Sequence, residues 1–223
     1  MTANKYGNFL TILLVILIVA ILVSIGIVFI NYVIKPKNEE GKAKEAIAEF
    51  DKNIEENNNE TEDAIVTNTI ASPDETVSNP GSGTTKKKTY YEGFVMIGYI
   101  TIPKTKVKEP ILDNVTPDAL NTAVSVLYPS NPKLNEPGNV VIIGHNYRNG
   151  KFFSDNDKLS IGDKVLIKDE TGRELSYTIY QKFETSEQDT SFYTRDTNGV
   201  PEITLSTCTD DSKARIIILA KAD

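Results

Sequence analysis

An uninterrupted apolar run near the N-terminus constrains this chain more than any other feature. Residues 9–30 read FLTILLVILIVAILVSIGIVFI and contain no charged side chain. As a helix, this run would span roughly 33 Å, which is enough for a hydrocarbon core of about 30 Å. We therefore expect residues 9–34 to form a single-pass membrane anchor, after a short head of residues 1–8.

Two other interpretations of this run fit less well. A cleaved signal peptide has a shorter apolar core that ends in a small-x-small site, whereas Ser24-Ile25-Gly26 lies inside the run. A buried core helix is disfavoured because both flanks are polar and no amphipathic face exists. Lysine counts leave the orientation open, because they weakly favour a cytoplasmic C-terminal part and are unreliable for long translocated domains.

Residues 35–88 are polar and acidic. Between positions 38 and 78 the chain carries 12 acidic residues against three lysines, so the net charge of −7 arises here. Ala43, Ile47, Phe50 and Ile54 recur at helical spacing and predict a short amphipathic helix, either partly formed at the surface or packed on the domain or a partner. The runs ENNNETED and SPDETVSNPGSGTTKKK are typical of disorder. We interpret residues 35–88 as a tether.

The remaining residues, 89–223, consist of short apolar runs rich in β-branched and aromatic side chains, broken by turn signals. Thr116-Pro117-Asp118 predicts the start of a short helix that reaches about Val124, and Glu170-Thr171-Gly172 predicts a hairpin turn. Seven or eight short strands with one or two short helices indicate an all-β barrel or sandwich. Strands are predicted at residues 94–102, 139–143, 164–168, 175–183, 203–207 and 215–220.

Composition excludes several function classes. One cysteine cannot form an intrachain disulfide, and one cysteine with one histidine makes a structural zinc site improbable. The acidic balance argues against nucleic acid as a partner, because phosphates require a basic face. Nucleophile–base chemistry in this chain must use Cys208 and His145, or carboxylates and hydroxyls.

Both rare side chains stand at predicted strand ends, in VVIIGHN for His145 and ITLSTC for Cys208. Arg215 begins the next predicted strand, and a turn between the two strands would return its guanidinium to the sulfur, where it could stabilise a thiolate or an oxyanion. A lone cysteine is nevertheless most often a small buried hydrophobe. Composition and spacing alone leave both interpretations open.

Short motifs in this region resemble those of the sortase family. TLSTC at positions 204–208, followed by an arginine that heads a strand, resembles the TLxTC…R signature of sortases, and the resemblance covers residues 94–220. An N-terminal span followed by a linker is also the usual sortase layout. The other matching segments, in order, are IGYITIP (97–103) as the opening strand, EPIL (109–112) as the early loop, IGH (143–145), FF (152–153) and LSIGD (159–163).

The resemblance implies a closed eight-stranded sortase-type β-barrel and a cysteine transpeptidase, with residues 89–223 as the catalytic domain. Cys208 would attack an LPxTG-like sorting signal to form a thioacyl enzyme, and His145 would exchange protons with the leaving and incoming amines. Arg215 would hold the oxyanion, and Thr207 would contact the substrate backbone. The implied partners are sorting-signal proteins and an amine acceptor such as a cell-wall precursor peptide. The family also implies that the domain lies outside the cell membrane and that the short head of residues 1–8 is cytoplasmic.

Several finer interpretations stay open. Ser206 and the short interval between Cys208 and Arg215 resemble class B sortases, whereas the short connection after Phe183 does not. A B-like, D-like or housekeeping-like sortase therefore fits, and a pilin-linking sortase is disfavoured. We expect no cofactor; a calcium site in the 184–201 loop is the alternative, using Glu184, Glu187, Asp189 and Asp196. We expect Asp210 and Asp211 to face solvent. Competing functions are a plain cysteine endopeptidase and a catalytically silent tethered binding module.

Overall fold

The computed structural model describes residues 3–30, 35–67, 87–127 and 132–223. These residues form two compact units, Met1–Glu45 and Ala46–Asp223. The helices and 3-10 turns are α1 (Ala3–Phe29), α2 (Lys35–Thr67), η3 (Pro103–Thr105), α3 (Pro117–Thr122) and η4 (Asn156–Lys158). The strands are β1 (Thr89–Tyr91), β2 (Phe94–Ile102), β3 (Val107–Leu112), β4 (Val124–Val126), β5 (Gly138–Ile143), β6 (Lys164–Asp169), β7 (Glu174–Thr185), β8 (Pro201–Cys208) and β9 (Arg215–Ala222).

The first unit is dominated by α1. Its segment Phe9–Phe29 is long and apolar enough to cross a membrane, and none of it is buried in the structure. The helix therefore has the length and composition of the anchor that the sequence predicts.

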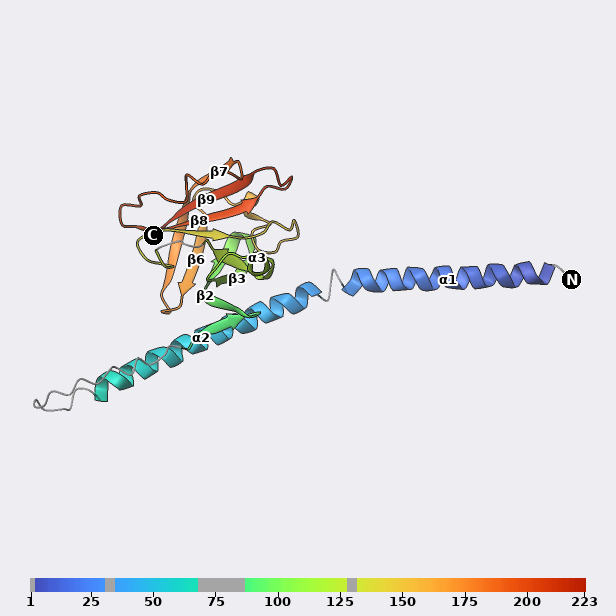
Figure 1. Cartoon of the computed structure of the whole chain (residues 1–223), viewed down its shortest axis with the longest axis horizontal. Helices are drawn as coiled ribbons and strands as arrows, with labels where there is room; N and C mark the ends of the chain where they lie inside the picture. The colour runs from blue at the N-terminus through green and yellow to red at the C-terminus, as the bar shows by residue number, and fades with distance from the viewer. Residues whose placement is uncertain (1–2, 31–34, 68–86, 128–131) are drawn as a thin grey trace, which may run out of the picture. The chain divides into compact units, whose positions relative to one another are not determined.

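The second unit contains a closed β-barrel of eight strands, as predicted (Figure 1). The order is β2-β3-β4-β5-β8-β9-β7-β6, and pairing of β6 with β2 closes the sheet. Pairing is antiparallel except for β3 with β4 and β5 with β8, which are parallel. Gly98 is needed at the closure, because a Cβ there would overlap the carbonyl oxygen of Lys168 in β6. A closed sheet leaves no barrel edge to pair with other chains.

Alternation along the strands fills the barrel interior. Successive side chains of a strand face opposite sides, so Ile203 and Leu205 of β8 enter the main core while Thr204 and Ser206 face outwards. A second, smaller cluster lies on the outer face of β9, where Ile217 and Leu219 pack with Phe192 from the β7–β8 loop. The outer face of β8 and β9 is thus covered by this loop.

Helix α2 is much longer than the short amphipathic helix expected from the sequence. Its side chains Ile47, Phe50 and Ile54 are buried, and the Phe50 ring meets the Tyr99 ring edge-on at a centroid distance of 6.2 Å. Asn53 Nδ2 donates to the hydroxyl of Thr89 at 2.8 Å. Ile47, Phe50 and Ile54 therefore form the face that packs on the barrel, and the compact unit that contains the barrel begins at Ala46.

The disorder expected for residues 56–63 is not observed, because α2 continues through them to Thr67. The side chain of Asn57 accepts from the backbone N–H of Lys87 at 2.9 Å, and Lys87 also pairs with Glu56 at 3.1 Å. These contacts join α2 to the segment before β1 and lengthen the part of α2 that is held against the folded unit. The second run that was expected to be disordered, residues 72–88, falls mainly on residues 68–86, which lie outside the described residues.

The remaining strand predictions agree with the structure within two residues at each end, and α3 begins after the Thr116 cap, which accepts from Ala119 N at 3.1 Å. The segment EPIL at 109–112, expected to be a loop, belongs to β3 instead. Pro110 is tolerated there because pairing of β3 with β4 starts only at Ile111, so Pro110 has β2 as its one neighbour. The three-residue strands β1 and β4 were not predicted.

Candidate active site

Two parallel neighbours in the sheet bring the rare side chains to one edge of the barrel. β5 and β8 pair in parallel, with Gly138 opposite Pro201 and Ile143 opposite Ser206. The carboxyl ends of parallel neighbours meet at the same sheet edge, so His145, two residues after β5, and Cys208, the last residue of β8, emerge there together. The backbone N–H of Gly144 donates to the Ser206 carbonyl at 3.2 Å and continues the pairing toward His145.

Cys208 and Arg215 are in direct contact. They are opposite residues of the antiparallel pair β8–β9, so their side chains share a face. Nη1 of Arg215 lies 3.2 Å from Sγ of Cys208 and donates to it, and both side chains are half-buried. A cation at this distance stabilises negative charge on sulfur or on an oxygen that develops beside it.

His145 lies in the electrostatic field of the same arginine. Burial lowers the pKa of its imidazole, and the positive charge of Arg215 lowers it further. The ring is half-buried and stacks at a tilt on Tyr147, with 5.0 Å between ring centroids. The neutral imidazole therefore predominates at neutral pH, which suits a group that must accept a proton and return it.

Close packing beneath His145 requires glycine at position 144. A Cβ on Gly144 would lie 2.7 Å from Cδ2 of Phe153 and 2.9 Å from Cγ1 of Val124. The backbone N–H of Phe153 also donates to the carbonyl of His145 at 3.2 Å. The backbone of His145 is thus held between the core and the loop that follows it.

Thr207 occupies a different environment from its neighbour Cys208. Its side chain is 1% exposed, on the opposite face of β8 from the thiol, and its hydroxyl has no hydrogen-bond partner among the described residues. The expected contact between Thr207 and substrate stays a prediction.

Sequence reasoning missed the side chain that joins the His145 segment to the Cys208 segment. Asn146 Nδ2 donates to the backbone carbonyl of Cys208 at 3.1 Å and to Oδ1 of Asp210 at 2.8 Å. Asp210 is exposed as expected, but its carboxylate faces Asn146. Asp211 instead organises its own turn and accepts from the hydroxyl of Thr209 at 2.7 Å, the largest of the causes that lower the pKa of Asp211. The one signal in the sequence was the position of Asn146 directly after His145.

An ion pair fixes the loop between β7 and β8 to the outer face of β8. Nη2 of Arg195 lies 2.6 Å from Oε2 of Glu202, and Nη1 donates to the hydroxyl of Thr204 at 2.7 Å and to the carbonyl of Phe192 at 3.0 Å. The Tyr180 hydroxyl also donates to Glu202. The loop therefore has a fixed shape on the same face of β8 as Cys208.

Two of the four carboxylates considered for calcium, Asp189 and Asp196, have hydrogen-bond partners in or beside this loop. Asp189 accepts from the hydroxyls of Thr185 and Ser191, and Asp196 accepts from the backbone N–H of Asn198. Within the described parts of the chain, no group of three or more His, Cys, Asp or Glu side chains is placed to hold a metal ion. The calcium site stays a prediction.

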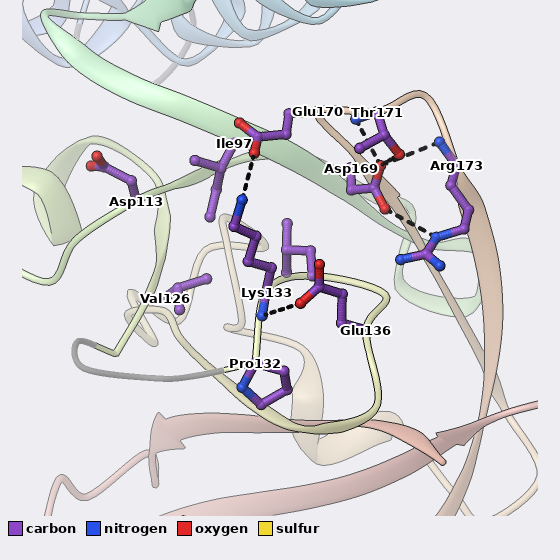
Figure 2. Close-up of a pocket in the computed structure, with 11 residues that line it drawn as sticks. Ile97, Asp113, Val126, Pro132, Lys133, Glu136, Asp169, Glu170, Thr171 and Arg173 are labelled. Carbon is purple, nitrogen blue, oxygen red and sulfur yellow. Dashed lines mark hydrogen bonds and ion pairs between the residues drawn. The ribbon is translucent and has the colours of Figure 1, made fainter. Parts of the chain in front are cut away.

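A separate cavity of about 200 Å³ lies between the β4–β5 connection and the β6–β7 hairpin (Figure 2). None of His145, Cys208 and Arg215 lines it. Its most buried acid, Asp169, accepts from the backbone N–H and hydroxyl of Thr171 and from the backbone N–H and Nε of Arg173. The side-chain amide of Asn135 also donates to it. These donors close the hairpin and leave Asp169 a structural role.

Comparison with known proteins supports one family. The sequence matches the family model for the sortase domain over residues 100–223. No curated protein sequence matches the chain. Among solved structures, a sortase D5 transpeptidase of Clostridium perfringens is 26% identical with a TM-score of 0.60, covering 82% of this chain and 99% of that one.

Two sortases that are named as another class are also similar. Sortase A of Corynebacterium diphtheriae, as a lid mutant, is 25% identical with a TM-score of 0.53, covering 57% of this chain and 70% of that one. Sortase A of Listeria monocytogenes shares the fold at 20% identity and a TM-score of 0.53, covering 57% of this chain and 87% of that one. Similarity thus extends across classes, and the class of this chain stays open. Since the family model matches more than half of the sequence, the chain belongs to the sortase family of cysteine transpeptidases.

Proposed function

We propose that the chain is a membrane-anchored transpeptidase that cleaves an LPxTG-like sorting signal and transfers the protein upstream of the cut, through its new carboxyl-terminal Thr, to an amine of the cell wall. The observation that carries this proposal is the 3.2 Å contact between Arg215 Nη1 and Cys208 Sγ, at the sheet edge where His145 also emerges. A thiol paired with a guanidinium beside a neutral imidazole is the set of groups that acyl transfer through sulfur requires.

In the first half-reaction, Cys208 Sγ attacks the carbonyl carbon of the Thr in the signal. The carbonyl oxygen becomes an oxyanion, which the guanidinium of Arg215 stabilises. The C–N bond then breaks, the leaving amine takes a proton from His145, and a thioester with Cys208 remains. The site needs a protonated imidazole at this step, and the thiol proton that the attack releases supplies it.

In the second half-reaction, an amine from the acceptor attacks the thioester carbonyl. His145 removes a proton from this amine, the C–S bond breaks, and the sulfur regains its proton from the imidazolium. The result is a new amide and the starting enzyme, so no other reactant is consumed. Water in place of the amine would give hydrolysis only, which is the plain endopeptidase alternative.

Helix α1 supports the proposed location. Its uncovered apolar surface over Phe9–Phe29 has the length of a membrane span. Sorting signals and cell-wall amines are found outside the cell membrane, so the unit that carries Cys208 would face outward. The chain would thus act where newly exported proteins are still close to the membrane.

The test uses the full chain in detergent micelles with a library of LPxTG-like peptides and triglycine. Intact mass spectrometry should show a peptide adduct on the wild-type protein, and product analysis should show triglycine ligated to the cleaved peptide. Cys208→Ala should lose both signals while it keeps the fold. Cleavage without a ligated product would instead establish an endopeptidase, and no reaction across the library would favour a silent binding module.

A further inference from the structure

We propose that Asn146 is a positioning residue that holds the His145 segment in register with Cys208. This inference rests on the proposed function, since it assigns a role within the same site. Asn146 follows His145 directly in the chain, and its side chain contacts the backbone of the nucleophile residue itself. One short side chain thus couples the backbone next to the imidazole to the backbone that carries the thiol.

The side-chain amide of Asn146 is fully used. Nδ2 donates to the Cys208 carbonyl at 3.1 Å and to Asp210 Oδ1 at 2.8 Å, while Oδ1 accepts from the backbone N–H of Arg148 at 3.0 Å. Both amide protons point across to the segment after β8, and the oxygen closes the turn on its own side. An amide with separate donors and acceptor can make this three-way link, whereas a carboxylate or a hydroxyl of the same reach cannot.

The two segments that Asn146 joins are each rigid by themselves. On the Cys208 side, the N–H of Thr209 donates to the carbonyl of Ala214 at 2.9 Å, so the turn before Arg215 is closed. On the His145 side, Tyr147 N–H donates to the hydroxyl of Ser154 at 3.0 Å. Because each segment is a rigid body, a link between them fixes one relative position instead of adjusting to many.

A second contact runs parallel to the first. Nη2 of Arg148 donates to the hydroxyl of Ser212 at 3.0 Å, again from the His145 segment to the segment after Cys208. This contact is exposed at the surface and is therefore the weaker of the two. The link through Asn146 is closer to the reacting atoms and is shielded from water on the side of Cys208, since both residues are half-buried.

The position of the imidazole decides the rate of both half-reactions. His145 must reach the leaving nitrogen while the sulfur attacks, and later the incoming nitrogen while the sulfur departs. A displacement of about 1 Å in such an arrangement costs on the order of 100-fold in rate. Loss of the Asn146 link should therefore lower kcat without weakening the binding of the peptide.

The experiment compares three variants of the full chain with the wild type in detergent. The substrates are triglycine and a sorting peptide that the wild-type chain ligates to it. Asn146→Ala removes all three hydrogen bonds. Asn146→Asp keeps the acceptor for Arg148 and so keeps the turn, but it removes both donors to Cys208 and Asp210. Asn149→Ala is the matched control, because Asn149 accepts a similar turn hydrogen bond from the N–H of Lys151 in the same loop and, among the described residues, makes no hydrogen bond to the Cys208 segment.

We expect kcat to fall by about 10- to 100-fold in both Asn146 variants, with KM for the peptide within about 2-fold of wild type. Asn149→Ala should retain wild-type kcat. Melting curves accompany the kinetics, and Asn146→Asp decides the question if Asn146→Ala is unstable, because it preserves the turn.

Wild-type kcat in Asn146→Asp, or a rise in KM at constant kcat, would overturn the inference and leave the transpeptidase assignment intact. An equal loss of kcat in Asn149→Ala would also overturn it, since loop integrity alone would then explain the effect. Failure of the wild-type chain to ligate any peptide would overturn the proposed function together with this inference.

Discussion

Replacement of Phe50 by alanine tests whether α2 is a working part of the folded unit. Phe50 is 3% exposed and packs edge-on against Tyr99 of β2, 6.2 Å between ring centroids. Phe→Ala changes in cores cost about 3–5 kcal/mol, and the edge-to-face pair contributes about 0.5–1.5 kcal/mol of such a loss. A helix on the outside of a barrel can shift to fill part of the space, so we expect the lower end, about 3 kcal/mol.

For a unit of this size, that loss of unfolding free energy corresponds to a fall in Tm of about 6–12 °C. The full chain in detergent can be followed by near-ultraviolet circular dichroism, because it has 10 tyrosines and no tryptophan. Thermal and urea unfolding should both report the loss, with the urea midpoint shifted at an unchanged slope.

Glu49→Ala is the matched control for this experiment, because Glu49 precedes Phe50 in the same turn and is exposed. Its Tm should stay close to that of the wild type. Equal melting of Phe50→Ala and Glu49→Ala would refute the reasoning, since it would show that α2 contributes no packing to the barrel in solution.

Three further perturbations test the site and its surroundings. The chain has one histidine, so NMR titration of the protein without a histidine tag reports His145 alone. Arg215→Gln removes a positive charge that lowers the His145 pKa. The pKa should therefore rise in this variant, and an unchanged titration would contradict the reasoning. Asp169→Asn removes the charged acceptor that closes the β6–β7 hairpin and should cost about 3 kcal/mol in urea unfolding. Arg195→Met leaves Glu202 unpaired and mostly buried and should cost about 3 kcal/mol, whereas Arg195→Met with Glu202→Gln should lose less than the two single changes combined.

The pH dependence of stability follows from His145 with a definite sign. Its folded pKa lies below the unfolded value, so the unfolded chain binds more protons as pH falls through about 6.5. The free energy of unfolding is therefore independent of this group above that pH, and it declines as the pH falls below it. Arg215→Gln should reduce the decline, and urea midpoints between pH 5 and pH 8 would measure it.

Local pattern was sufficient for the longer strands and for the catalytic candidates. Residues 94–102 are rich in β-branched and aromatic side chains and are followed by Pro103, and the structure has a strand over the same span. Cys208 and His145 could be singled out because each is the only residue of its type in the chain. Arg215 could be placed opposite Cys208 because a short turn between antiparallel strands fixes their register.

Features that depend on tertiary contacts could not be predicted in this way. The three consecutive asparagines at positions 57–59 disfavour a helix, and α2 contacts Lys87 through Glu56 and Asn57 there, which no local pattern records. The three-residue strand β4 is too short to show a period. The bond from Asn146 to the Cys208 carbonyl exists only because β5 and β8 are neighbours in the sheet.

The parallel pairing of β5 with β8 also determines when in folding this protein acquires its chemistry. Asn146 and Cys208 lie 62 positions apart in the chain, so a long loop must close before the two segments meet, and contacts of this kind form late in folding. The β6–β7 hairpin, whose strands adjoin in sequence, can form much earlier. A chain that is still emerging or partly folded therefore carries an isolated thiol and an isolated imidazole. Recovery of ligation after dilution from denaturant should follow closure of the barrel, later than the first gain of β-structure.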